Sequence, residues 1–302
     1  MASKEMESLK QIMQQMMAAG FAPKFDGSAD AMQLRKVVQQ AQDNMAEITG
    51  VSFIDDEFAG IESEISMPDD AKDDYIVVYI HGGGLICGNA KSSRGYASML
   101  ADECKRPVIS FTYRLAPENK FPAMTNDSYD VYKAVTERYP DKPVYLIGES
   151  GGAYLCLAVA MMARDTGIKM PAGIVPYSPP IIFNDDIDRN FDGNKDFTVK
   201  PDSFVWLGGL AAESTEATRT EKYLNLTLDD YHDFCPVFLA WDESETLSVD
   251  SIWLTKAFEK AGVEYEAYSY PDCFHAFATT GRGTPESYEI MKNTVKFFDK
   301  HK

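Results

Sequence analysis

A serine flanked by glycines occupies the most informative position in this sequence. Gly148-Glu149-Ser150-Gly151-Gly152 forms a GxSxG pentapeptide between the apolar run PVYLI and the apolar segment AYLCLAVAMMA. Small neighbours at a sharp strand-to-helix turn let a serine hydroxyl stand above a sheet and face the N-terminus of the next helix. We therefore predict that Ser150 is a nucleophile, with the Gly151 N–H and the helix dipole stabilising developing negative charge.

A second glycine cluster, His81-Gly82-Gly83-Gly84, directly follows the apolar run DYIVVYI. Consecutive glycines leave N–H groups unshielded, and an acyl-transfer enzyme needs such donors where the tetrahedral oxyanion forms; losing one raises the barrier by ~3 kcal/mol. A phosphate-binding loop of the GxxxxGK[ST] type is disfavoured because no Lys-Ser or Lys-Thr pair closes this stretch. His81 precedes the donors at the strand end, so we expect a structural role for it.

His275 is the histidine best placed to serve as general base. It follows the run YEAYSY and the turn Pro271-Asp272, which puts it on a loop after the carboxyl end of a strand, where open α/β sheets bind ligands. An imidazole titrates near neutrality, so it can accept the Ser150 proton and return it to a leaving alcohol. His232 and His301 are weaker candidates, one just past a polar segment and one at the end of the sequence.

Four motifs, in the expected order, resemble those of the hormone-sensitive-lipase-like carboxylesterases (the HGGG, bacterial family IV esterases) of the α/β-hydrolase superfamily. They are HGGG at 81–84, YRLAPE at 113–118 with FPA at 121–123, GESGG at 148–152 in place of the usual GDSAG, and CFHAF at 273–277. The resemblance covers most of residues 70–302. It implies an oxyanion hole of Gly83, Gly84 and Gly151, and hydrolysis of short-chain esters, acetyl to about hexanoyl, through an acyl-enzyme intermediate. It also implies that no cofactor is needed.

The acid of the triad is where this sequence departs from that family, whose usual motif is DPLxxD. An ungapped match anchored on Pro236, Leu247 and His275 places Glu245 at the acid position, 30 residues before His275. A glutamate can serve as well as an aspartate, because only a buried carboxylate facing the histidine Nδ1 is required. Asp242 is the alternative, since it lies closer to the end of the preceding strand; if Glu245 is the acid, we expect Asp242 to cap that strand in solvent.

The elements that must position these residues alternate between short apolar runs and helical segments. The runs, which we predict to be buried parallel strands, are Asp74–Ile80, Pro107–Tyr113, Pro143–Ile147, Gly173–Tyr177, Val237–Trp241 and Glu264–Tyr270. The helical segments between them are Gly95–Cys104, Thr125–Tyr139, Ala153–Arg164 and Val249–Ala261. This alternation predicts a doubly wound α/β sheet. The resemblance implies that this sheet belongs to an α/β-hydrolase fold, which is a mostly parallel twisted sheet flanked by helices, with a helical cap.

Two segments fall outside this alternation. Residues 1–47 show helical spacing of apolar residues, with a methionine-rich stripe, and residues 183–230 are polar and acidic with Phe204 and Leu207 embedded. We predict that the first is an N-terminal helical cap segment and the second a cap insertion, which together close over Ser150 and limit acyl length. The catalytic domain would then comprise residues 48–182 and 231–302. The alternative is that the insertion is a surface excursion unrelated to function.

The composition limits the partners and the location. A formal charge of −18 disfavours nucleic acid and anionic membranes, leaving a small-molecule ester as the expected partner. Five scattered cysteines without a CxxC pair indicate reduced thiols, and four histidines without HExxH or HxH spacing predict no metal site. Charged residues near the N-terminus and the lack of an 18-residue apolar run predict a cytoplasmic protein. The sequence leaves a homodimer open.

Two other functional classes share this constellation. An acyltransferase or amidase can use the same triad, and no residue in the sequence excludes either. A non-catalytic ligand-binding member of the fold, similar to the plant hormone receptors related to these esterases, would lack the catalytic histidine. The presence of His275 at the expected place argues against that class.

Overall fold

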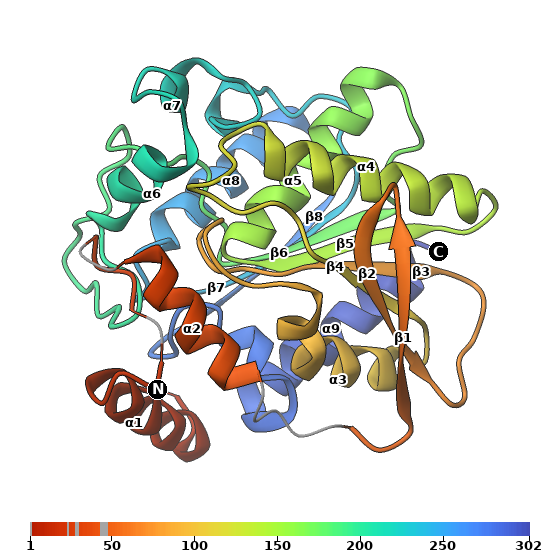
Figure 1. Ribbon diagram of the computed structural model, residues 1–302, viewed down its shortest axis with the longest axis horizontal. Helices are drawn as coiled ribbons and strands as arrows, with labels where there is room; N and C mark the ends of the chain where they lie inside the picture. The colour runs from red at the N-terminus through yellow and green to blue at the C-terminus, as the bar shows by residue number, and fades with distance from the viewer. Residues whose placement is uncertain (1, 23, 28–29, 43–47) are drawn as a thin grey trace.

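The computed structural model describes residues 2–22, 24–27, 30–42 and 48–302, and places the strands in one eight-stranded sheet with helices on both faces (Figure 1). The strand order is β1-β2-β4-β3-β5-β6-β7-β8. Pairing is antiparallel between β1, β2 and β4 and parallel across the rest of the sheet. The strands are β1 (Val51–Phe58), β2 (Ile61–Pro68), β3 (Ile76–Ile80), β4 (Val108–Phe111), β5 (Val144–Glu149), β6 (Gly173–Tyr177), β7 (Val237–Asp242) and β8 (Tyr265–Tyr270).

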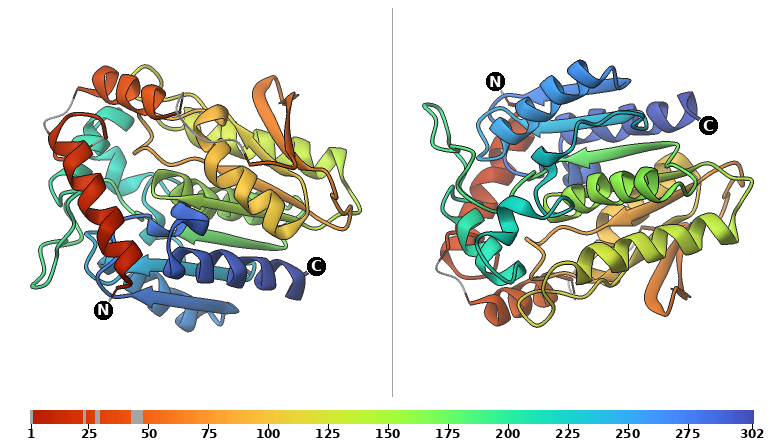
Figure 2. Two further views of the ribbon diagram at one scale, coloured as in Figure 1. Left: turned by 90° about the horizontal axis from the view of Figure 1, so that it is seen from below. Right: turned by 90° about the horizontal axis from the view of Figure 1, so that it is seen from above.

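Helices cover the sheet in two layers (Figure 2), with α4, α5 and α8 on one face and α3 and α9 on the other. The α-helices are α1 (Lys4–Ala18), α2 (Ala31–Gln42), α3 (Arg94–Cys104), α4 (Ala123–Arg138), α5 (Gly151–Thr166), α6 (Ser203–Ala211), α7 (Ala217–Thr220), α8 (Ser248–Ala261) and α9 (Pro285–Lys300). Short 3₁₀ helices are η1 (Ala90–Ser93), η2 (Leu226–Leu228) and η3 (Phe277–Gly283). No helix in the described ranges is both long and apolar enough to cross a lipid bilayer.

The predicted α/β-hydrolase architecture is confirmed, and each predicted strand and helix is present with small shifts at its ends. The hairpin β1–β2 and helix α9 were not predicted. The hairpin is polar because it lies at the edge of the sheet, and its local signal is the two-residue turn Ala59-Gly60, where both residues have positive φ. The signal for α9 is a capping box between Thr284 and Ser287 with Pro285 at the first turn.

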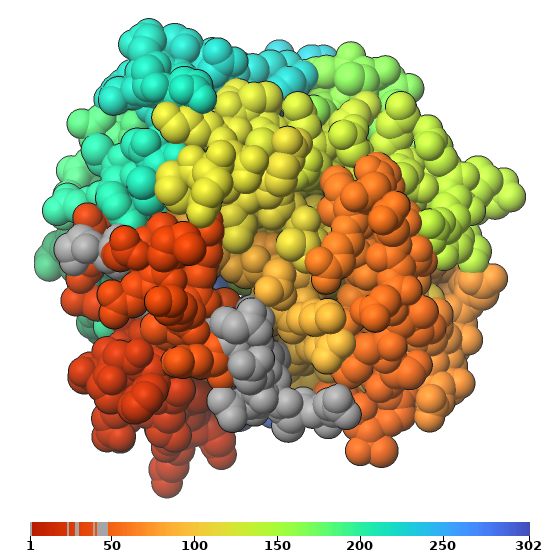
Figure 3. Space-filling model, viewed as in Figure 1, coloured from red at the N-terminus to blue at the C-terminus, as the bar shows by residue number. Residues whose placement is uncertain are grey.

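The N-terminal segment and the insertion at 183–230 lie side by side at one end of the sheet (Figure 1). Phe25 joins them: its N–H donates to the Thr198 C=O at 2.9 Å, and its own C=O accepts from the Lys200 N–H at 2.9 Å. Figure 3 shows the same contact as adjoining surfaces, red against cyan. The two segments therefore contact each other through Phe25; that they act as a cap stays a prediction. Part of the predicted second helix, residues 43–47, lies outside the described residues.

The two N-terminal helices are attached to different parts of the catalytic domain. Arg35 of α2 fastens that helix beside the glycine cluster, because its Nε donates to the Ile86 C=O at 2.6 Å and its Nη atoms pair with Glu118. The methionine-rich helix α1 packs instead against α9, where Ser3 Oγ donates to Glu286 at 2.8 Å. Of the two helices expected to close over Ser150, α2 therefore lies beside the glycine cluster and α1 lies against α9; closure over Ser150 stays a prediction.

A buried ion pair fastens the insertion to the catalytic domain. The Arg189 guanidinium, 2% exposed, donates to both carboxylate oxygens of Asp250, 0% exposed, at 2.8 and 2.7 Å. We expect Arg189→Met to lower the free energy of unfolding by about 3–5 kcal/mol, because the Asp250 charge stays buried and, among the described residues, keeps only the Ile181 N–H as a donor. Urea unfolding of both proteins measures the difference.

Arg219, in the same insertion, provides the matched control for that measurement. It pairs with Asp185 and Asp186, whose carboxylates are exposed, so Arg219→Met should cost less than about 1 kcal/mol. Equal losses in the two variants would contradict the idea that the buried pair holds the insertion in place.

Candidate active site

Ser150 stands at the turn from β5 to α5 with a backbone that non-glycine residues rarely adopt, φ 52° and ψ −121°. The turn is possible because its neighbours lack side chains: a Cβ on Gly148 would lie 2.6 Å from the Ile80 carbonyl oxygen, and one on Gly152 only 2.0 Å from it. The Ser150 N–H donates to the Tyr177 C=O at 2.9 Å, which holds the turn against β6. Helix α5, buried almost throughout, fixes the position of the turn from beneath.

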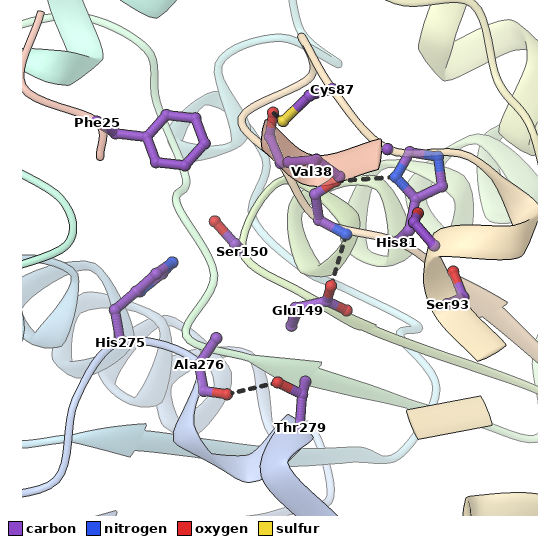
Figure 4. Close-up of a pocket in the computed structure, with 14 residues that line it drawn as sticks. Phe25, Val38, His81, Cys87, Ser93, Glu149, Ser150, His275, Ala276 and Thr279 are labelled. Atoms are coloured by element: carbon purple, nitrogen blue, oxygen red, sulfur yellow. Dashed lines mark hydrogen bonds between the residues drawn. The ribbon is translucent and has the colours of Figure 1, made fainter. Parts of the chain in front are cut away.

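His275 and Glu245 form a hydrogen-bonded pair beside this serine. The His275 Nδ1 lies 2.6 Å from Glu245 Oε2, and the glutamate side chain is 0% exposed. Figure 4 shows the ring of His275 directed toward Ser150, so its other nitrogen, Nε2, is the one that faces the serine. His275 lies between β8 and η3, after the strand end where the sequence placed it. The structure thus brings together the three residues predicted to form the triad.

Burial and charge set the protonation of this pair. Burial raises the pKa of Glu245 to about 7, against the lowering from its hydrogen bond with His275. Burial alone would lower the pKa of His275, but the hydrogen bond and charge of Glu245 raise it overall, with a further contribution from Asp196. A carboxylate at Nδ1 therefore makes His275 a stronger base than the buried ring would be by itself.

Asp196, from the insertion, is a neighbour that the sequence did not reveal. Its carboxylate lies with Glu245 and His275 in a group whose polar atoms are within 4.8 Å of one another. One Asp196 oxygen accepts from the N–H groups of Thr198 and Val199, and the other from the Thr246 N–H at 3.0 Å. Because these acceptors are already used and Nδ1 of His275 is bonded to Glu245, the group fits a hydrogen-bonded network better than a set of metal ligands.

Asp242 does not lie where the sequence led us to expect. It is 1% exposed, so the expectation that it caps the strand in solvent is wrong. One Asp242 oxygen accepts from the Cys273 N–H at 2.9 Å and the other from the Ser244 hydroxyl at 2.7 Å. The carboxylate thus supports the loop that carries His275, while Glu245 is the acid that contacts the imidazole.

The glycine cluster places backbone donors next to Ser150. A Cβ on Gly151 would lie 3.3 Å from the Gly84 nitrogen, so the two backbones are in contact. Positive φ angles at Gly83 (106°) and Gly84 (61°) shape this turn. Within the described part of the chain, the N–H groups of Gly83, Gly84 and Gly151 donate to no protein acceptor, which leaves all three for a ligand oxygen.

Glu149, the residue before the nucleophile, holds this glycine loop in place. Its Oε1 accepts from the Gly82 N–H at 2.8 Å and its Oε2 from the Tyr79 hydroxyl at 2.5 Å. Burial raises the pKa of Glu149 to about 7, although both donors lower it. In the sequence this glutamate is only a departure from GDSAG, and no pattern there predicts its contact with Gly82.

The other histidines show no catalytic geometry. His81 stacks on Tyr113 with ring centres 4.1 Å apart, and its Nδ1 lies 2.8 Å from the Gly82 C=O. Burial lowers the pKa of His81 to about 4, so the ring is neutral and the expected structural role fits. His232 is exposed beside Asp230, and His301 packs on Phe297 near the C-terminus.

Two cavities open from Ser150, and Figure 4 shows the residues that line the larger one. The larger has a volume of about 250 Å³, and its wall includes His275, Ala276, Thr279, His81, Gly83 and Val38. The smaller has a volume of about 20 Å³ and is lined by Phe25, Gly84, Ser150, Gly151, Pro180, Phe183, Val199, Phe204 and Leu207. Phe25 and Ser150 border both cavities. Phe25 belongs to the N-terminal segment, and the smaller cavity is also lined by residues of the insertion, so both segments contribute to the site.

The sequence profile of the alpha/beta hydrolase fold family matches residues 77–279, a range that contains the glycine cluster, Ser150, Glu245 and His275. The chain belongs to this family. The match covers the larger part of the chain and all of the site described above. It confirms the alpha/beta hydrolase part of the resemblance that the motifs indicated.

Proteins similar in sequence to this chain include named esterases. An acetyl-hydrolase of Streptomyces hygroscopicus is 28% identical over 219 residues, covering 68% of this chain and 69% of the relative. The versiconal hemiacetal acetate esterase of Aspergillus parasiticus is 26% identical over 212 residues, covering 66% of this chain and 67% of the relative. A crystal structure of an esterase from the bacterial hormone-sensitive lipase family superposes with a TM-score of 0.87 at 22% identity, covering 100% of this chain and 99% of that one.

Proposed function

We propose that this chain is a serine carboxylesterase that hydrolyses short-chain acyl esters of small molecules through an acyl-enzyme intermediate. The observation that carries the proposal is the arrangement at one cavity: Ser150 on its strained turn, and His275 held by Glu245 at 2.6 Å. The backbone N–H groups of Gly83, Gly84 and Gly151 lie beside the serine and have no acceptor among the described residues. This combination of nucleophile, oriented base and oxyanion donors is what acyl transfer requires.

In the proposed reaction, Ser150 Oγ attacks the ester carbonyl carbon while His275 Nε2 takes the hydroxyl proton. The carbonyl oxygen becomes an oxyanion that accepts from the glycine N–H groups. The bond to the alcohol breaks as His275 returns that proton to the leaving oxygen, which leaves an acyl-serine. A water molecule then attacks the acyl carbon in the same way and releases the acid.

The substrate range rests on the resemblance and on the relatives. Two relatives that match over about two thirds of the chain are named for acetyl or acetate esters. We therefore place the acyl group within the acetyl to hexanoyl range. The cytoplasmic location, the lack of nucleic-acid or membrane partners and the open question of a homodimer stay predictions from the sequence.

Labelling with a fluorophosphonate, followed by a substrate panel, tests this function. The phosphonate should add one equivalent to Ser150, detected by peptide mass spectrometry, and abolish turnover of p-nitrophenyl esters. The panel comprises esters, the matching anilides, and esters with added alcohol acceptors. Release of free acid from esters alone supports the esterase. Faster cleavage of anilides than of esters indicates an amidase. Acyl transfer to the added alcohol in preference to water indicates an acyltransferase. No labelling and no turnover would leave only a binding protein.

A further inference from the structure

The two cavities at Ser150 differ in which catalytic groups they contain. The larger cavity, of about 250 Å³, includes His275 and the adjoining residues Ala276 and Thr279. The smaller, of about 20 Å³, contains no residue of that loop but includes Gly84 and Gly151, whose N–H groups are the proposed oxyanion donors. In Figure 4 the rings of Phe25 and His275 approach Ser150 from different sides.

If the proposed function holds, this difference assigns the two halves of an ester. The carbon bonded to Ser150 Oγ carries an oxyanion, a leaving alcohol and an acyl chain. The alcohol oxygen must lie within reach of His275, because it receives the proton from that ring. The alcohol therefore occupies the larger cavity, and the acyl chain is left with the smaller one.

The smaller cavity has room for about one small group. A space of roughly 10–15 Å³ holds a single water molecule by this measure, so about 20 Å³ fits a methyl group and little more. Apart from Ser150 its walls are apolar, and all but Ser150 and Phe25 are buried. Two of the aromatic walls are fixed by other contacts. The Phe183 ring packs edge-on against Tyr154 at 4.9 Å, and the Phe204 ring lies 3.9 Å from the Arg189 guanidinium, which Asp250 holds.

Leu207 is the wall residue whose side chain comes nearest to a Cβ placed on Gly84. It projects from α6 of the insertion, and its Cδ2 lies 3.0 Å from where a Cβ on Gly84 would be, beside the proposed oxyanion donors. Unlike Phe183 and Phe204, it takes part in no ring or cation contact in the described structure, so its size can be changed with less disturbance.

We propose that this esterase is selective for acetyl esters and tolerant of the alcohol, with Leu207 as the residue that determines the acyl limit. A propionyl or butyryl chain would have to displace Leu207 or a fixed aromatic wall, whereas the alcohol side offers more than ten times the volume. This narrows the acetyl to hexanoyl range implied by the family resemblance to its shortest member.

The test compares kcat/KM for p-nitrophenyl acetate, butyrate and hexanoate, which share one alcohol. The wild type should prefer acetate over butyrate by at least about tenfold, since a single methylene in an apolar pocket can discriminate by that much. Leu207→Ala should reduce this preference to less than about threefold, mainly by raising the butyrate value. Leu207→Val should lie between the two, and it decides the outcome if the alanine variant does not fold.

Leu210→Ala is the matched control, because Leu210 lies on the same helix, is half-buried and does not line the small cavity. It should leave the acetate preference unchanged. Methyl, phenyl and 1-naphthyl acetate form a second arm, and their relative kcat/KM values should not respond to Leu207→Ala.

Equal wild-type rates on acetate and butyrate, or a preference that neither Leu207 variant alters, would overturn the acyl-pocket proposal while leaving the esterase assignment intact. Absence of turnover on every ester above the Ser150→Ala background would instead refute the proposed function itself.

Discussion

Replacing Ser150 by alanine should lower kcat for p-nitrophenyl acetate by at least ~10⁴-fold, because the acyl-enzyme cannot form without the Oγ nucleophile. The serine hydroxyls that line the larger cavity are poor substitutes. Ser92 Oγ donates to the Asn89 C=O at 2.6 Å, and Ser93 Oγ also faces that carbonyl. Initial rates at saturating substrate, corrected for spontaneous hydrolysis, measure the loss.

The same variant should fold as the wild type does. Alanine retains the Cβ of serine, so the backbone at φ 52° is neither eased nor further strained, and the Ser150 N–H keeps its bond to Tyr177. We expect a melting temperature within about 2 °C of the wild type, consistent with loss of less than about 0.5 kcal/mol. Ser52→Ala, on the edge strand β1, is the control and should leave both quantities unchanged. Activity within tenfold of the wild type in Ser150→Ala would refute the serine mechanism.

The strand–turn–helix around Ser150 could be predicted from sequence because each of its requirements is local. The apolar run before the serine, the glycines beside it and the apolar helix after it are all contiguous, and steric crowding at Gly148 and Gly152 enforces the turn. The same holds for the glycine cluster after β3. The apolar patterns of the short buried strands and of the buried helix then predict the fold class.

Contacts between distant segments could not be predicted in this way. Asp196 reaches the Glu245–His275 pair from within the insertion, and Glu149 holds Gly82 through a side chain that no spacing rule identifies. Phe25 lines the site because a backbone bridge to Val199 brings the N-terminal segment there. The burial of Asp242 was missed because the strand end it caps is covered by the loop that carries His275, a feature of tertiary packing.

Glu245→Gln should lower kcat by at least ~10²-fold and leave KM little changed. The amide keeps the size of the glutamate but cannot balance an imidazolium, and its NH₂ group can donate to His275 Nδ1, which selects the tautomer with a proton on Nε2. That tautomer cannot accept the Ser150 proton. Because Glu245 contacts His275 and lines neither cavity, substrate binding should be preserved. Steady-state kinetics on p-nitrophenyl acetate provide both parameters.

Two neighbouring acids serve as controls for this result. Glu243→Gln should be nearly neutral, because Glu243 is exposed and its carboxylate contacts Ser269. Asp242→Asn should lower kcat by less than about tenfold, since the amide oxygen can still accept from the Cys273 N–H. A larger loss in Asp242→Asn than in Glu245→Gln would transfer the role of the acid to Asp242.

The pH profile separates an electrostatic role of Glu245 from a merely structural one. His275 must be neutral to accept a proton, so kcat/KM should rise with pH through the pKa of His275, which the Glu245 carboxylate raises above its ordinary value. In Glu245→Gln that carboxylate is absent, so less opposes the lowering of the His275 pKa by burial. The acidic limb of the profile should therefore move to lower pH even as the maximal rate falls. Asp196 and Glu149 also contribute to raising the pKa of His275 and are retained in the variant, so the shift should be partial. A reduced rate with an unmoved limb would mean that Glu245 only supports the loop.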